Sequence, residues 1–429
     1  MAKEKNEMNI IARIILILFI LLTSSCNRKK DTIPLNVIPV ASTVGNYNVL
    51  NLSDFASEIR YIPLETNDQV LISPINLEII YENEKVLIRD HSPTGSNCYL
   101  FDDSGKFCVK IGQRGQGPDE YVDIDNISVY ENLIYLMTWH KLLVYDTTGH
   151  LVENINLRSE ELPMEFRKSA LRKIIPLKKN AFVVDVVTVG SYPTAFLFET
   201  NQSIVETIKE YPSSVKLDKP NGGYGSAELG KMYRYEDEVR IYKPINDTIF
   251  TISQNKHIKT AFIFELGKYR VTLAYWEWKG LGGDAMERLM SHNNMTKNFI
   301  FLSKIYESFN HLFIKFDFGN HSPEPYETSH LGQKYTAYDV YSVFDKRTGV
   351  LTLMRQPIKG NLGFKNDIDN GPIIFPHYIS SNNELVTFIQ PEEFMEYYNK
   401  TQNPSAELKK IADKLQIDDN PIIIVAKLK

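Results

Sequence analysis

The residues of this sequence that most resemble a chemical site form a glycine-rich run at positions 112–118. Backbone N–H groups in such a run can cradle an anion, and Arg114, Asp119 and Glu120 are the polar side chains that the loop would present to a ligand. The run lacks the Lys-Ser/Thr pair of a phosphate-binding P-loop, and residues 121–124 do not read as the start of a helix. We therefore favour a tight structural connection, in which glycine supplies positive φ, over a ligand-binding loop.

Acidic residues and histidines offer weaker candidates for metal or catalytic chemistry. The tetrapeptide Asp-Ile-Asp-Asn occurs at residues 123–126 and 367–370, and its oxygen atoms would suit Ca²⁺, but neither copy continues as an EF-hand loop. A turn that enters a strand is the favoured interpretation of both copies. The nine histidines show no zinc-binding spacing, and the sequence has no G-x-S-x-G nucleophile motif. The sequence therefore predicts no metal and no cofactor, while carboxylates from distant segments could still meet in the fold.

A pair of tryptophans provides a possible carbohydrate contact. Trp276 and Trp278 flank Glu277, and exposed indole rings at this spacing could stack on sugar rings. Aromatic residues in a long segment are more often buried beneath it, which is the favoured interpretation here. Both tryptophans are kept as ligand-binding candidates.

The N-terminus has the pattern of a secretory leader. Basic residues precede the apolar run 14–22, and small residues then lead into Cys26. Nine apolar residues rise only about 14 Å as a helix, about half of a bilayer core, so a transmembrane anchor is disfavoured. We predict a lipoprotein signal peptide at residues 1–25 and a lipid on Cys26. Because Thr23 stands where a lipobox usually has Leu, cleavage to a soluble protein remains the alternative.

The segment after Cys26 is predicted to be a flexible tether. Residues 26–48 are polar, contain two prolines and show no sustained periodicity. The acyl chain would hold the protein on a membrane while the tether lets the folded body stand clear of it. Arg28, Lys29 and Lys30 follow the cysteine, where surface-exported lipoproteins tend to be acidic. We therefore expect an outer-membrane anchor that faces the periplasm.

Composition indicates a soluble folded body with a sizeable core. Hydrophobic residues make up 43% of the 429 residues and charged residues 24%, and the chain carries 24 Tyr and 22 Phe. Aromatic residues suit the half-buried surface of β-sheets. The net charge of −5, with both signs interspersed, gives no basic face for nucleic acid, so we expect no nucleic-acid partner.

A repeated motif predicts the architecture. An aromatic-Asp pair, a turn containing Gly and a second strand occur at residues 100–107, 144–151 and 343–351. Weaker copies place further aromatics at positions 198 and 250. From position 101 to position 250 these aromatics are spaced by about 44 to 53 residues, the period of a four-stranded propeller blade. Two strands precede the hairpin in the first copies, which gives four strands per repeat.

The last third of the chain is predicted to complete a six-bladed ring. Between Phe250 and Phe344 the interval nearly doubles, and we interpret residues 275–291 as a helical or long-loop insertion in blade five. A sixth blade would use segments 373–379, 384–389 and 422–428, with helical material at 391–415 split by Pro404. Residues 58–64 would supply its fourth strand. The predicted fold class is thus all-β: a six-bladed β-propeller at residues 49–429, closed by N- and C-terminal strands.

Several motifs also carry a family resemblance. The sequence resembles the six-bladed β-propeller lipoproteins of Bacteroidetes, whose propeller is near the NHL-repeat type. The resemblance lies in motifs that follow the same order along the chain, at residues 62–66, 111–121, 246–249 and 418–421. The resemblance spans almost the whole mature chain. It implies a propeller fold and an envelope location, and it brings no established general activity.

Cys98 and Cys108 are the other two cysteines of the chain, and they flank the turn at residues 102–105. If those four residues form the loop, Phe101 faces Lys106 and the two cysteines point to opposite sides of the sheet, so a disulfide would need a register slip of one. Free thiols are the favoured state.

For function, the sequence favours a non-enzymatic envelope protein that holds a glycan, peptide or protein partner at one mouth of the propeller. The rival is a propeller enzyme, a lyase or a lactonase-like hydrolase, with an acid–base or metal site at the channel mouth. A purely structural part of an envelope complex is a third possibility.

Overall fold

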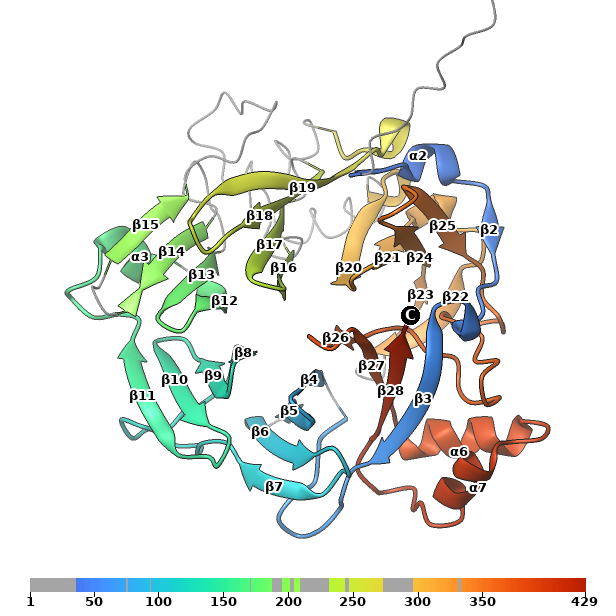
Figure 1. The fold of residues 1–429 in the computed structure, drawn as a ribbon, viewed down its shortest axis with the longest axis horizontal. Helices are drawn as coiled ribbons and strands as arrows, with labels where there is room; N and C mark the ends of the chain where they lie inside the picture. The colour runs from blue at the N-terminus through green and yellow to red at the C-terminus, as the bar shows by residue number, and fades with distance from the viewer. Residues whose placement is uncertain are drawn as a thin grey trace, which may run out of the picture. The chain divides into compact units, whose positions relative to one another are not determined.

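The computed structural model describes residues 36–429, apart from residues 75, 93, 170, 187–194, 201–203, 209–230, 244–246, 273–295 and 331–332. The strands of this part form six main sheets around a central axis, so the predicted six-bladed β-propeller is confirmed (Figure 1). Within the described residues, no helix is long and apolar enough to cross a membrane.

Blades one to four are each built from consecutive strands that run from the axis outward. Blades one and two contain β4 (Glu78–Glu82), β5 (Lys85–Ser92), β6 (Gly95–Asp102), β7 (Phe107–Lys110), β8 (Asn126–Tyr130), β9 (Leu133–Met137), β10 (Lys141–Asp146) and β11 (Leu151–Asn156). Blades three and four contain β12 (Leu171–Lys178), β13 (Ala181–Val186), β14 (Ala195–Glu199), β15 (Ile204–Ile208), β16 (Lys231–Tyr235), β17 (Glu238–Lys243), β18 (Thr248–Ile252) and β19 (Ile258–Phe264).

Blade five contains an inserted hairpin that the sequence analysis missed. Its strands are β20 (Phe301–Glu307), β21 (His311–Asp317), β24 (Asp339–Asp345) and β25 (Val350–Met354), and the hairpin of β22 (Tyr326–His330) and β23 (Gln333–Ala337) lies between the second and third. This hairpin accounts for part of the long interval before Phe344. The insertion predicted at residues 275–291 lies outside the described residues.

Blade six closes the ring with strands from both ends of the chain, as predicted. It contains β26 (Tyr378–Ile379), β27 (Glu384–Ile389), β28 (Ile422–Leu428) and, outermost, β3 (Ala56–Pro63). The helices α6 (Pro391–Lys400) and α7 (Ala406–Ala412) precede β28, and Pro404 lies between them. The Ser405 hydroxyl accepts a hydrogen bond from Leu408 N–H at 3.2 Å, which caps α7.

The chain before β3 forms a belt around blades four and five, which corrects the predicted tether boundary at residue 48. Strand β1 (Val37–Ile38) adds to the outer edge of β19, and β2 (Tyr47–Asn48) adds to β25, both in parallel. Helix α2 (Val40–Thr43) joins them. Ile38 and Val40 are fully buried in the core cluster between blades four and five. The sequence analysis missed β1 and β2 because a strand of two residues is too short to show an alternating hydrophobic pattern.

The repeated Asp of each hairpin holds a turn. The Asp102 carboxylate accepts hydrogen bonds from Ser104 N–H at 2.9 Å and from Lys106 N–H at 3.0 Å, and Asp146 accepts the same two bonds in blade two. Gly105 and Gly149 follow with φ near +86°. The motif is therefore an Asx turn whose glycine takes the left-handed conformation.

The hydrophobic core lies between neighbouring blades. One cluster joins Ile80 and Leu87 of blade one to Ile127 and Ile134 of blade two. The next joins blades two and three around Phe166 of helix α3 (Met164–Lys168). Such packing follows from the strand pattern, because side chains alternate between the two faces of each blade and both faces are covered.

The hairpin register near the cysteines differs from the expectation. Phe101 faces Phe107 rather than Lys106, because a bulge lies between Leu100 and Phe101. Cys98 is buried and Cys108 is exposed, and both are free thiols. Burial raises the pKa of the Cys98 thiol, so this cysteine is held in the neutral form.

Candidate functional site

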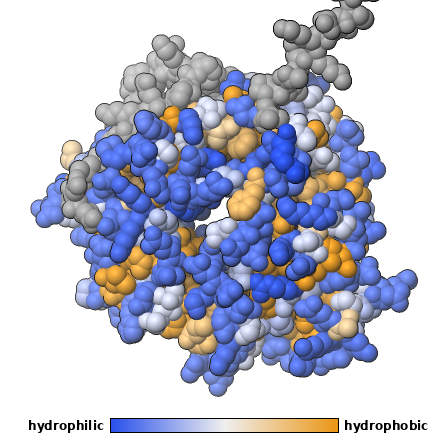
Figure 2. Space-filling model, viewed as in Figure 1, coloured by the Kyte–Doolittle hydropathy of each residue, from blue (hydrophilic) through white to orange (hydrophobic). Residues whose placement is uncertain are grey.

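A channel of about 820 Å³ runs along the propeller axis, and the inner strands of all six blades contribute to its lining. Figure 2 shows one face of the molecule, with an opening near the centre surrounded mainly by hydrophilic residues. Every blade begins at its inner strand and hairpins outward. The inner strands therefore run in one direction, and the channel has two distinct mouths: one where these strands begin and one where they end.

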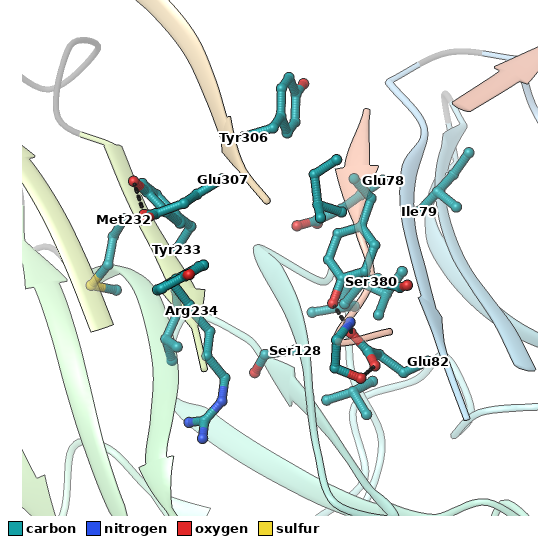
Figure 3. Close-up of a pocket in the computed structure, with 18 of the residues that line it drawn as sticks. Glu78, Ile79, Glu82, Ser128, Met232, Tyr233, Arg234, Tyr306, Glu307 and Ser380 are labelled. Atoms are coloured by element: carbon teal, nitrogen blue, oxygen red, sulfur yellow. Dashed lines mark hydrogen bonds between the residues drawn. The ribbon is translucent and has the colours of Figure 1, made fainter. Parts of the chain in front are cut away.

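We call the mouth where the inner strands end the opposite mouth. Ion pairs and hydrogen bonds join several of its charged side chains to neighbouring residues. The carboxylate of Glu307 accepts from Tyr233 Oη at 2.9 Å and from Arg240 Nε at 3.1 Å, and it pairs with Lys346 Nζ at 3.1 Å. Figure 3 shows Tyr233 and Glu307 joined on one side of the channel. Because this carboxylate is 1% exposed and fully satisfied, we assign it a structural role.

Glu82 is held in the same way on the other side of this mouth. Its carboxylate accepts Tyr378 Oη at 2.7 Å and Ser381 N–H at 2.9 Å. Arg234 points its guanidinium away from these carboxylates (Figure 3) and donates to Pro176 O at 2.6 Å. Its guanidinium also lies 4.4 Å from the centroid of the Tyr130 ring. Glu82, Glu307 and Arg234 are thus bonded to neighbouring groups, and the carboxylates of Glu131 and Glu236 also line this mouth.

The basic mouth, defined by Lys173, Lys231 and Lys304, lies where the inner strands begin. The three lysines come from β12, β16 and β20 and all line the channel. Lys173 and Lys304 each follow a bulge in the inner strand, and bulges re-aim the side chains next to them. Three cations from three blades therefore meet at this mouth.

The basic mouth is electrostatically crowded. Burial, and then Arg172, Lys304 and Lys173, lower the pKa of Lys231 to about 8. Burial and Lys315 lower the pKa of Lys304, although its side chain still reaches the open channel. Burial, with Lys304 and Lys315, lowers the pKa of His377 to about 4, so this histidine is neutral. Strongly shifted groups in a cavity mark a candidate site.

The glycine-rich loop at residues 112–118 connects blades one and two, as the favoured interpretation predicted. Lys141 Nζ donates to the carbonyls of Gly117, Pro118 and Glu120 at 2.9, 2.6 and 3.1 Å and so ties the loop to blade two. Gly112 has φ +68°. The backbone carbonyls of the loop thus surround the Lys141 ammonium group of the protein itself.

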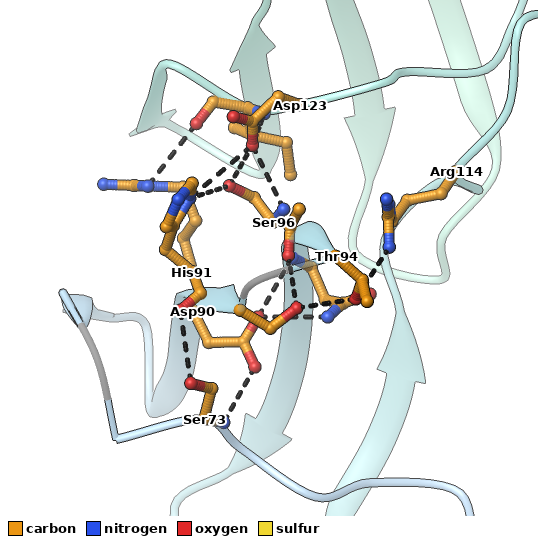
Figure 4. Close-up of polar contacts among 12 residues, drawn as sticks. Ser73, Asp90, His91, Thr94, Ser96, Arg114 and Asp123 are labelled. Carbon is orange, nitrogen blue, oxygen red and sulfur yellow. Dashed lines mark hydrogen bonds and ion pairs between the residues drawn. The ribbon is translucent and has the colours of Figure 1, made fainter.

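The three polar side chains predicted in this loop lie away from the channel lining. Arg114 Nη1 donates to Thr94 Oγ1 at 3.3 Å (Figure 4), Glu120 accepts Gly117 N–H at 2.8 Å, and Asp119 accepts Asn154 Nδ2 at 3.1 Å. Their contacts hold the loop and its neighbours together. A ligand-binding role for Arg114, Asp119 and Glu120 stays a prediction.

A Ser, His and Asp cluster near this loop has a structural arrangement. Ser96 Oγ donates directly to Asp123 and lies 3.2 Å from His91 Nδ1 (Figure 4). A catalytic triad would place the imidazole between the serine and the carboxylate. Because Ser96 is fully buried and bonded to the carboxylate itself, its hydroxyl cannot act as an exposed nucleophile.

The remaining predicted positions divide into two groups. Asp123 and Asp367, from the two Asp-Ile-Asp-Asn copies, accept backbone N–H groups, Ile124 at 2.9 Å and Ser53 at 2.9 Å. The Ser53 bond joins two distant segments, and the local turn of the second copy is held by Asp369, which accepts Gly371 N–H at 3.0 Å. Among the described residues, no three His, Cys, Asp or Glu side chains form a group that could hold a metal ion. Cys26, Trp276 and Trp278 lie outside the described residues.

Sequence reasoning missed the three lysines of the basic mouth. They lie far apart in the chain, and lysine at the start of a strand is usually a solvated surface residue. No local pattern in the sequence distinguishes them from the other lysines. The closed ring brings them together.

A solved structure of a Bacteroides protein agrees with the fold. A crystal structure of a protein from Bacteroides fragilis, described as a candidate exported protein, superposes with a TM-score of 0.63 at 17% identity, over 92% of this chain and 99% of that one. A member of the DUF4221 family from Bacteroides vulgatus gives a TM-score of 0.49 at 14% identity, over 87% and 97%. No curated protein matches the chain. The closer likeness to NHL-type propellers stays a prediction.

The profile of one protein family, described as "Domain of unknown function (DUF4934)", matches residues 35–427. The match covers the belt, all six blades and both terminal strands of the ring. It begins close to the first described residue, where the belt starts to pair with blade four. The chain therefore belongs to the DUF4934 family, whose fold here is a six-bladed β-propeller.

Proposed function

We propose that this chain is an exported lipoprotein of the bacterial envelope, anchored by a lipid on Cys26, that binds a glycan, peptide or protein partner at its channel. The observation that carries the binding role is the channel itself, about 820 Å³ in volume and lined by polar groups from six blades. Ligand sites are commonly concave and of this size, with a few converging polar groups. The proposal assigns the protein no chemical step.

Two features support an envelope location. Residues 1–25 have the pattern of a lipoprotein leader, and the neighbour from Bacteroides fragilis is described as a candidate exported protein. The basic residues after Cys26 favour an outer-membrane anchor that faces the periplasm. The propeller would then present its mouths to the periplasmic fluid.

The basic mouth is the better of the two mouths for a ligand. Glu82 and Glu307 at the opposite mouth are bonded to neighbouring side chains, so a ligand would have to break those bonds. The lysines of the basic mouth are crowded by one another instead. Among the described residues, Lys173 and Lys304 form no ion pair, so an anionic group could bind to them without breaking one.

The anchor is tested by cell fractionation. Cys26→Ala should move the protein from the membrane to the soluble fraction, and the wild-type mature N-terminus should carry acyl mass on Cys26. Cys108→Ala is the matched control, because Cys108 is an exposed free thiol on the propeller, and it should remain with the membrane. A Cys26→Ala protein that stays on the membrane would contradict the anchor.

The binding site is tested with the mature protein in detergent, screened by thermal shift against oligosaccharides and peptides. Ser128→Tyr narrows the channel midway along β8 and should abolish the shift given by the true ligand. Lysine acylation read by mass spectrometry provides a second measurement, because ligand should protect Lys304. A ligand that binds Ser128→Tyr normally and leaves Lys304 reactive would place the site elsewhere, and steady turnover of the ligand would overturn the non-catalytic assignment.

A further inference from the structure

The two mouths of the channel carry charges of opposite sign that have no counter-charge in the protein. At the basic mouth, Lys173 and Lys304 form no ion pair among the described residues. At the opposite mouth, Glu131 and Glu236 likewise form no ion pair with any residue that the structure describes. All four residues line the same channel. A ligand with one negative end and one positive end could therefore pair with both sets at once.

The other charged groups that line the mouths leave this polarity in place. At the basic mouth, Glu78 pairs with Arg89 Nε at 3.0 Å, and burial raises the pKa of Asp125, which weakens its negative charge. At the opposite mouth, Arg234 Nη2 pairs with Asp237 Oδ1 at 3.3 Å. The channel therefore has a positive end and a negative end.

The two ends lie one inner strand apart. In blade four, β16 begins at Lys231, and Glu236 follows its last residue. From residue 231 to residue 236 an extended chain rises about 17 Å. Lys304 and Lys173 both lower the pKa of Lys231, so the cations of blades three and five lie near the start of this strand. The ligand must therefore hold its two charges on the order of 15 Å apart.

The two carboxylates at the negative end occupy the same place in two blades. Glu131 and Glu236 each follow the last residue of an inner strand, with φ +54° and φ +51°. The equivalent turn of blade one has Asn83, with φ +50°. Asparagine adopts this left-handed conformation more readily than glutamate. The stability of the turn alone therefore does not explain a glutamate at either position.

The channel wall between the two ends can bond a peptide backbone. Tyr306 of β20 lines the wall, and its hydroxyl has no hydrogen-bond partner in the part of the chain that the structure describes. Ser128 of β8 lines the wall from blade two (Figure 3) and donates its hydroxyl hydrogen to Ile174 O at 3.4 Å. A tyrosine hydroxyl can donate to a peptide C=O, and a serine oxygen can accept from a peptide N–H.

A short linear peptide has the charges that the channel requires. Its ammonium and carboxylate groups lie at opposite ends, and about four or five extended residues span about 13 to 18 Å. An acidic sugar chain has no positive end, and a polyamine has no negative end. A single amino acid carries both charges on one carbon atom and cannot reach both mouths. Charge-assisted hydrogen bonds at the two ends would also fix the direction of the peptide.

We infer that the channel binds a linear peptide of about four or five residues with both ends free, its carboxylate on Lys173 and Lys304 and its ammonium on Glu131 and Glu236. This inference rests on the proposed binding function and names a peptide as the ligand. The C-terminus of the peptide lies where the inner strands begin, and its N-terminus lies where they end. The bound peptide therefore runs antiparallel to the inner strands.

Affinity selection with peptide libraries tests both ends. The mature protein in detergent is mixed with equal amounts of random tetrapeptides and pentapeptides that have free ends, acetylated N-termini or amidated C-termini. Mass spectrometry after gel filtration measures which peptides stay bound. We expect free-ended peptides to be retained about tenfold more than either capped form. Equal retention of free and capped peptides would overturn the inference, and an effect of one cap alone would overturn the contact assigned to the other end.

Matched variants locate each end. Lys304→Met should lower the retention of free-ended peptides about tenfold and leave amidated peptides unchanged, because the amide has no charge to lose. Glu236→Gln should act in the same way, with acetylated peptides unchanged. Lys409→Met on α7 and Glu153→Gln on β11 are the controls, because both residues are exposed, and they should retain peptides as wild type. A capped peptide that stays sensitive to its matched variant would contradict that contact. If a variant fails to fold, the capped libraries still decide with the wild-type protein.

Glu131→Asn separates binding from stability. Asparagine suits the φ of +54° better than glutamate, so the Tm should rise, while the retention of free-ended peptides should fall severalfold. A lower Tm would show that the glutamate holds the turn. Unchanged retention would contradict Glu131 as a ligand contact.

The inference and the proposed function fail differently. Cellotetraose and tetragalacturonate are screened in parallel as probes without a peptide backbone. If no peptide is retained but a saccharide is, and Ser128→Tyr abolishes its retention, the channel is a ligand site and only the peptide assignment is wrong. If Ser128→Tyr retains every bound probe like wild type, the channel is not the site and both fall.

Discussion

At the scale of single residues, the shifted pKa of Lys231 makes the stability of the protein depend on pH. In the folded protein the pKa of Lys231 is about 8, below the ordinary lysine value of 10.5. Between pH 8 and pH 10.5 the unfolded chain therefore binds more protons than the folded protein. Because of this difference, the free energy of unfolding rises with pH over that range. The charged form therefore costs stability at neutral pH. After burial, Arg172, Lys304 and Lys173 lower this pKa, and Asp185 raises it.

We predict that Lys231→Met stabilises the free protein at pH 7. After allowance for solvent screening we expect about 1 kcal/mol, which raises the Tm of a chain this long by about 1 to 2 °C. Differential scanning calorimetry at pH 7 and pH 9.5 measures the effect, and the gain should shrink at the higher pH. A drop in Tm at pH 7 would show that Lys231 has stabilising contacts that outweigh its crowding.

At the scale of single elements, two hairpin turns with the same backbone shape differ in their surroundings. Gly105 and Gly149 both have φ +86°. A Cβ on Gly105 would lie 2.2 Å from the carbonyl oxygen of Pro63 in β3, whereas on Gly149 it would lie 2.8 Å from a Val109 methyl group. Gly105→Ala should therefore cost about 2 to 4 kcal/mol, and Gly149→Ala about 1 to 2 kcal/mol. Chemical denaturation measures the loss in free energy of unfolding for both variants. Equal losses would refute the clash between residue 105 and the Pro63 carbonyl.

The belt gives a second prediction at this scale. Ile38 is fully buried between blades four and five, so Ile38→Ala should reduce the free energy of unfolding by about 2 to 4 kcal/mol. Val49→Ala is the control, because Val49 is 46% exposed, and it should cost less than about 0.5 kcal/mol. Urea melts would measure both. A neutral Ile38→Ala would mean that the belt is not part of the cooperative unit.

At the scale of the whole molecule, stability depends on ring closure. Strand β28 pairs with β27 on one side and with β3 on the other, and Ile422, Ile423 and Ile424 are fully buried. Removing residues 421–429 would leave β3 without a partner and open an edge in blade six. We expect a loss of several kcal/mol, with a lower Tm and a larger hydrodynamic radius. Removing Lys429 alone is the control, and a truncated chain that melts like the control would contradict closure through β28.

The aromatic-Asp hairpins, the six blades and the two terminal strands could be read from the sequence because each depends on local chemistry. Asp102 and Gly105 specify their turn within four residues, and the apolar run in 422–428 marks a buried strand wherever it pairs. The two-residue strands of the belt and the bulge before Phe101 escaped detection, because neither has a repeating pattern and both depend on the partner strand. The basic mouth depended on tertiary structure alone. Lys173, Lys231 and Lys304 are ordinary strand lysines in the sequence, and they become a cation cluster only because closing the ring directs three inner strands toward one axis.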